Sequence, residues 1–274
     1  MMPLMAILVV FGGFMSFDLS LASSWTTIFI IIGAVVLVIG ILSIFLIEEV
    51  NQSTVGNEQY FKNIIYGFKP STVKANPVLY LTIVAFAIFG IAIQVFMPYL
   101  IIYYEVALKL DNYVLIMAPA IIIAGVITAF YGRYYDKAGF ISAIFPSLAC
   151  LALGFILLSI FTNVALVFVG SLLMMTGYLT GMAVFGAMMR DYTPVDKAGA
   201  FQGLRIVGQV LIPGIIGPMI GAGVLKNADV IIGNDGTQSF IPNRSIFVAS
   251  LIVLVVCFAF TWLIKYALNK KSKK

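Results

Sequence analysis

Histidine is absent from this chain of 274 residues, and charged side chains make up only 10% of it. Soluble globular chains carry roughly 25% charge, so this chain has too few polar groups to cover a surface that faces water. The lack of histidine removes the commonest metal ligand and general base, which argues against most hydrolase mechanisms, a metal site or a cofactor. The two cysteines, Cys150 and Cys257, lie inside apolar runs, so no disulfide framework is expected.

Apolar sequence is abundant instead. Hydrophobic residues form 62% of the chain, and the mean hydropathy is +1.10. A helix needs about 20 apolar residues to cross a ~30 Å hydrocarbon core, and only helices and closed barrels satisfy their own backbone there. The sequence therefore predicts an all-α membrane protein of about eight transmembrane helices, at 1–17, 25–47, 78–103, 112–132, 140–161, 163–188, 201–225 and 245–267.

Basic residues are distributed unevenly between the connections. Three of the sixteen, Lys109, Lys226 and Arg244, fall on one side, and the other thirteen fall in 48–77, 133–139, 189–205 and 262–274. Because Lys and Arg collect in cytoplasmic connections, the bias predicts a multi-pass protein of the cytoplasmic membrane with both termini in the cytoplasm. The net charge of +5 then indicates contact with membrane lipid and not with nucleic acid.

The connection 48–77 is much longer than the others. Apolar residues from Tyr60 to Phe68 recur in it at helical spacing, which fits either an amphipathic helix on the membrane surface or a partly ordered linker. The chain thus divides into two spans over 1–47, a cytoplasmic linker over 48–77, and a six-helix bundle with a basic tail over 78–274. Such an arrangement matches one half of a transporter built from two six-helix halves.

The segment between the second and third spans of this bundle reads GRYYDKAGF, over 132–140. It resembles the major facilitator superfamily signature G-x-x-x-D-[RK]-x-G-[RK], found between the second and third helices of a six-helix half. Gly132, Asp136, Lys137 and Gly139 match, whereas Phe140 stands where a basic residue is usual. The resemblance implies that this segment helps to hold an inner gate shut. The alternative is an ordinary basic turn.

A second charged segment, MRDYTPVDKAGAFQGLR over 189–205, follows the fourth span of the bundle. Arg190, Asp191 and Arg205 lie at the ends of two adjoining spans and are candidates for the same gate. The segment is similar to the matching loop of the glycoside–pentoside–hexuronide cation symporters. That resemblance implies a sugar or glycoside as the small-molecule substrate and H⁺ or Na⁺ as the coupling cation. Solvated loop charges are the alternative.

Glycine and proline are concentrated in the run 201–225. They would destabilise a soluble helix, but in a membrane they allow close helix packing and kinks. Residues 217–222 read GPMIGA and loosely resemble the family pattern G-P-x-x-G-[GA], and the preceding span holds a G-x-x-x-G pair. The expected packing or kink positions are Gly177, Gly181, Pro213, Gly217, Pro218 and Gly221.

Polar side chains at membrane depth are few, and such groups usually face the bundle interior. Gln94 and Gln209 are expected either to line a central cavity or to hydrogen-bond between helices. Tyr99 and Tyr178 complete the candidate substrate path, although an aromatic belt explains Tyr99 equally well. No acidic residue lies deep in a predicted span, so the chain itself predicts no site for a coupling ion.

These features predict a secondary active transporter that moves a small solute by alternating access, and not an enzyme. A complete carrier of this kind needs about four more spans, so the sequence predicts a truncated product that lacks N-terminal helices or a complementary half. The alternative is the membrane permease subunit of an ATP-driven transporter, in which 189–205 would be the coupling helix. An intramembrane enzyme would need clustered catalytic groups, which the predicted spans lack.

Overall fold

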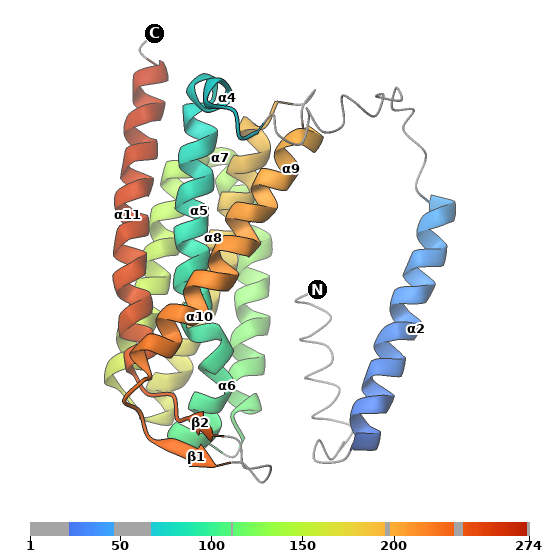
Figure 1. Ribbon diagram of the computed structural model, residues 1–274, viewed down its shortest axis with the longest axis vertical. Helices are drawn as coiled ribbons and strands as arrows, with labels where there is room; N and C mark the ends of the chain where they lie inside the picture. Colours follow the sequence, from blue (N-terminus) through green and yellow to red (C-terminus); the bar gives the residue numbers. More distant parts are fainter. Residues whose placement is uncertain (1–21, 47–66, 111, 195–197, 233–237, 273–274) are drawn as a thin grey trace. The chain divides into compact units, whose positions relative to one another are not determined.

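The structure is a computed structural model that describes residues 22–46, 67–110, 112–194, 198–232 and 238–272 (Figure 1). The chain forms two compact units, Met1–Tyr60 and Phe61–Lys274. The span predicted at 1–17 and most of the surface helix predicted between Tyr60 and Phe68 lie outside the described residues.

The first unit contributes one described helix, α2, which runs from Ala22 to Leu46. It has no charged residue, and large apolar side chains such as Phe29, Val36 and Phe45 are exposed along it. Its 25 residues would reach about 38 Å, which is enough to cross a hydrocarbon core. A helix that is apolar on every side has the composition of a membrane span.

The second unit is a helical bundle (Figure 1). Six helices in the described part of the chain, α2 included, are long and apolar enough to cross a membrane, which confirms the all-α membrane fold; the count of eight stays a prediction. The helices of this unit are α4 (Pro70–Ala75), α5 (Pro77–Phe96), α6 (Leu100–Ile102), α7 (Val114–Ile160), α8 (Val164–Tyr192), α9 (Ala198–Ile206), α10 (Ile212–Val224) and α11 (Ser245–Ser272). A 3-10 turn interrupts them at η1 (Met97–Tyr99), and wider, π-helical turns interrupt them at η2 (Tyr103–Ala107) and η4 (Val207–Leu211).

Helix α7 crosses the bundle twice. Its 47 residues would make a straight helix of about 70 Å, more than twice the thickness of a hydrocarbon core. Gly139 interrupts it with φ 77° and ψ 173°. Beyond this point the chain turns back, because the Tyr131 hydroxyl donates to the Ala143 carbonyl at 2.7 Å, two groups that a straight helix would hold about 18 Å apart. The two halves of α7 correspond to the predicted runs 112–132 and 140–161.

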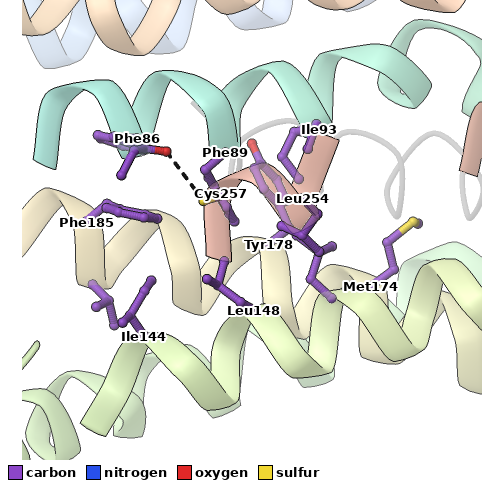
Figure 2. Packing of buried hydrophobic residues seen from close by; sticks show 14 of the residues in the cluster. Phe86, Phe89, Ile93, Ile144, Leu148, Met174, Tyr178, Phe185, Leu254 and Cys257 are labelled. Atoms are coloured by element: carbon purple, nitrogen blue, oxygen red, sulfur yellow. Dashed lines mark hydrogen bonds between the residues drawn. The ribbon is translucent and has the colours of Figure 1, made fainter. Parts of the chain in front are cut away.

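Aromatic side chains fill the centre of the bundle. Phe86 of α5 stacks on Phe185 of α8 with ring centroids 5.2 Å apart, and Phe89 lies 5.4 Å from the same ring. Leu148 of α7 and Leu254 of α11 complete the cluster (Figure 2). Four helices, α5, α7, α8 and α11, therefore share one core.

Glycines bring α10 against α5. A Cβ atom at Gly217 would clash with the side chain and backbone of Gln94, and one at Gly221 would clash with the Tyr99 ring. Pro213 fills the space beside Gly90 in the same interface. Small residues of this kind let two helix backbones approach closely within a membrane.

The G-x-x-x-G pair of α8 faces two different helices. Gly177 lies against the backbone of Leu151 on α7, whereas Gly181 lies against the ring of Phe89 on α5. The pair therefore does not form a single contact stripe. It places α8 between its two neighbours.

The end of the bundle that lies away from the charged segments carries a short hairpin. In the connection between α10 and α11, β1 (Val230–Ile232) and β2 (Gln238–Phe240) pair antiparallel. β-branched residues in β1 favour the extended backbone. Arg244 donates to the Ile160 carbonyl at 3.0 Å and so ties this loop to the end of α7.

Candidate transport gate and substrate path

The segment 132–140 is helical up to Gly139. Residues 132–138 continue the first half of α7, and the reversal takes place at Gly139 alone. The combination of φ 77° and ψ 173° belongs to a region of backbone space that is essentially restricted to glycine. The glycine of the signature is thus required by the turn itself.

A hydrogen bond links the two charged segments. The Tyr135 hydroxyl donates to Asp191 Oδ2 at 2.7 Å. Oδ1 of the same carboxylate forms an ion pair with Nη2 of Arg190 at 3.3 Å. Hydrogen bonds to a charged group are stronger than neutral ones. Tyr135 was missed by the sequence analysis, and its place inside the matched segment was the only signal for it.

A cavity of about 220 Å³ lies beside this hydrogen bond. It brings three of the predicted gate residues together, namely Gly132 and Asp136 from α7 and Arg190 from α8. Asp136 and Lys137 are exposed, and within the described residues neither of them forms an ion pair. The cavity is lined by Tyr131, Gly132, Tyr135, Asp136, Ala183, Val184, Ala187 and Arg190.

Phe140, the departure from the signature, points into the core. Only 6% of it is exposed, and its ring centroid lies 5.7 Å from that of Phe185. A basic side chain at this position would be buried among aromatic rings at considerable cost. Phe140 therefore anchors the turn to the bundle and supplies no charge to a gate.

Arg205, the third charged candidate of the second segment, lies on α9. Its Nε donates to Oε1 of Gln209 at 3.2 Å, across the start of the wide-turn segment η4. A second cavity, of about 250 Å³, separates it from Arg190. Two arginines thus share one cavity at this end of the bundle, together with Leu79, Ile83, Met189, Thr193, Phe201 and Gln202.

The candidate path residues are spread over three helices. Gln94 and Tyr99 are half-buried where α5 meets α10, and Gln209 is half-buried in η4. Tyr178 is only 8% exposed and belongs to the hydrophobic core (Figure 2). The amides therefore lie in helix interfaces, and Gln209 already has a partner in Arg205.

A comparison with known protein families gives one match. The model of the Major Facilitator Superfamily covers residues 1–218, which is most of the chain. The chain belongs to the major facilitator superfamily. No curated protein and no solved structure matches it.

Membership of the major facilitator superfamily makes this chain a multi-pass membrane protein of a family of secondary transporters, which in general are not enzymes. A small-molecule substrate and a lipid surrounding follow from that membership. The match includes α7 and α8 together with both charged segments, 132–140 and 189–205. It favours a secondary carrier over the permease subunit of an ATP-driven transporter.

Proposed function

We propose that this major facilitator protein carries a sugar or glycoside across the cytoplasmic membrane by alternating access, coupled to an H⁺ or Na⁺ gradient. The observation that carries the proposal is the bond between Tyr135 and Asp191. It joins the family signature on α7 to the charged segment whose sequence is similar to that of the sugar symporters.

The inner gate lies at this end of the bundle. Its residues are Gly132, Asp136, Lys137, Gly139, Arg190, Asp191 and Arg205. The exposed charges of Asp136 and Lys137 are available to pair with charges on a facing half of the carrier when the inner side is closed, whereas Arg190 is paired with Asp191. Opening toward the cytoplasm breaks these pairs, while the internal bond from Tyr135 keeps α7 and α8 together.

The substrate path follows α5, α8 and the continuous span formed by α9, η4 and α10, called the α9–α10 helix. Gln94, Tyr99, Tyr178 and Gln209 are its candidate contacts, because amide and phenol groups hydrogen-bond to sugar hydroxyls. Major facilitator carriers hold their substrate between two six-helix halves near the membrane midplane. The bundle over 78–274 acts as one half, and a complementary half supplies the facing wall and the coupling-ion site.

The gate end faces the cytoplasm. Lys69, Lys74, Lys137 and Arg190 lie at this end, on connections that hold most of the basic residues. In this orientation both termini and the linker over 48–77 are cytoplasmic, and the β1–β2 hairpin is external.

Uptake by native membrane vesicles tests this function. Vesicles from source cells with the gene intact or deleted are given labelled pentoses, β-glycosides and glucuronides, with a Na⁺ or H⁺ gradient imposed. We expect at least one of these sugars to accumulate only when both the gene and the gradient are present. Accumulation that requires ATP but no gradient would support the permease alternative, and identical uptake by both kinds of vesicle would reject sugar transport.

A further inference from the structure

A separate cavity at the gate end has no part in the proposed gate or path. It lies between the start of α5 and the end of α11, which pack side by side (Figure 1), and its volume is about 600 Å³. Lys74 and Lys270 line it, and the lining contains no acidic side chain. The remaining lining residues are Ala75, Asn76, Pro77, Val78, Leu79, Tyr192, Tyr266 and Ala267.

Aromatic and basic side chains of α11 mark the depth of this cavity in the membrane. Trp262 is 61% exposed and Tyr266 is 67% exposed, and the Lys265 ammonium lies 4.9 Å from the centre of the Trp262 ring. Exposed tryptophan and tyrosine beside lysine are typical of the layer of lipid headgroups. Lys270, at the cavity, lies about 12 Å further along the helix than Trp262, on the side of the water.

The wall that carries Lys74 is held in place by its own hydrogen bonds. Asn76 Nδ2 donates to the Thr72 carbonyl at 3.1 Å, the Thr72 side chain is buried, and the Tyr80 hydroxyl donates to the Gly67 carbonyl. The helix α4 is therefore fixed against α5, and its lysine faces a preformed space. Below the cavity, α11 exposes Leu263, Val255 and Ile252, an apolar surface that suits acyl chains.

We propose that this cavity binds the headgroup of an anionic phospholipid. The phosphate lies between the ammonium groups of Lys74 and Lys270, and Tyr266 donates a hydrogen bond to a phosphate or glycerol oxygen. The acyl chains follow the apolar surface of α11. Basic pockets between membrane helices bind anionic headgroups in this way, and the adjoining apolar surface favours a lipid over a soluble phosphate.

Native mass spectrometry of the full chain in a neutral detergent tests the site. The protein is titrated with phosphatidylglycerol or with phosphatidylcholine of the same acyl chains. We expect the Lys74→Gln/Lys270→Gln variant to bind phosphatidylglycerol roughly 10- to 30-fold more weakly than the parent protein. The matched control, Lys109→Gln/Lys226→Gln, removes the same charge at the opposite end and should bind like the parent.

A charge-preserving variant guards against a folding defect. Lys74→Arg/Lys270→Arg should retain the preference for phosphatidylglycerol, and each variant is accepted only if it is monodisperse with the parent's melting temperature. The proposal is overturned if phosphatidylcholine binds as tightly as phosphatidylglycerol, or if both glutamine variants lose binding equally. Competition by millimolar glycerol phosphate would assign the cavity to a soluble anion and would also overturn it.

Discussion

At the scale of single residues, Tyr135, Gly139 and Phe140 shape the end of the bundle at which we propose the inner gate. Gly139 allows the reversal between the two halves of α7, Phe140 fixes that reversal to the aromatic core, and Tyr135 connects it to α8. Each acts through a different property, namely backbone freedom, burial and a charged hydrogen bond. The consequences of changing them can therefore be separated.

Replacing Gly139 by alanine should destabilise the protein through its backbone alone. Nothing lies within 4 Å of a Cβ at this position, but its φ of 77° and ψ of 173° are strained for any other residue by about 1–3 kcal/mol. We expect a lower melting temperature in detergent for Gly139→Ala. Gly132→Ala is the control, since it also has open space and lies on regular helix; an equal loss in both variants would contradict the argument.

Removing the hydroxyl of Tyr135 should loosen α7 from α8. The bond to Asp191 joins a neutral donor to a carboxylate, and hydrogen bonds to charged groups contribute about 1.5–3 kcal/mol to stability. Because the Asp191 side chain is 41% exposed, we expect the contribution of this bond to lie at or below the lower end of that range. Tyr135→Phe should therefore unfold at a lower temperature than the parent. Tyr134→Phe, whose hydroxyl makes only a 3.4 Å contact with Ser142, should change little, and similar losses in both variants would count against the bond.

The sequence predicted part of this site and missed the rest for identifiable reasons. Gly132, Asp136 and Arg190 were singled out because a family signature and opposite charges are visible along the chain; one cavity brings them together, and their role as a gate stays a prediction. Tyr135 was missed because its partner lies 56 residues further along, and no spacing rule reports such a contact. The aromatic anchor at Phe140 was visible only as a departure from the signature, since burial depends on neighbours from other helices.

At the scale of helices, packing depends on where small residues meet large ones. On α10, Gly217 faces Gln94 of α5 in close contact, whereas Gly214, one turn away, faces open space. Apolar runs and glycine content predicted that these helices exist and pack closely, but not which glycine meets which partner. The hairpin β1–β2 was also missed, because three-residue strands lie below what local composition can indicate.

Two alanine substitutions on α10 test this packing. Gly217→Ala should cost about 1–3 kcal/mol, because its methyl group overpacks against Gln94. Gly214→Ala places the same methyl group in open space and should be neutral or stabilising by up to about 1 kcal/mol, since alanine is the better helix former. Melting temperatures in detergent compare the pair, and an equal effect of both substitutions would show that the α5–α10 contact does not depend on Gly217.

At the scale of the whole molecule, the account depends on the direction in which each helix crosses the membrane. The reversal at Gly139 gives α7 two crossings, and α8 and the α9–α10 helix add one each. Lys137 and Lys226 are therefore separated by three crossings and must lie on opposite sides. The sequence predicted this threading from the bias of its basic residues, because that bias needs only the order of spans and connections and no tertiary contact.

Cysteine labelling in intact cells tests this threading most directly. Lys137→Cys and Lys226→Cys are introduced separately into a Cys150→Ala/Cys257→Ala background and treated with a membrane-impermeant maleimide. Both positions are exposed, so accessibility depends on the side of the membrane alone, and the background protein gives the blank. The account predicts that Lys226→Cys is labelled in intact cells and Lys137→Cys only after permeabilisation. Labelling of both positions in intact cells, or of neither, would contradict it.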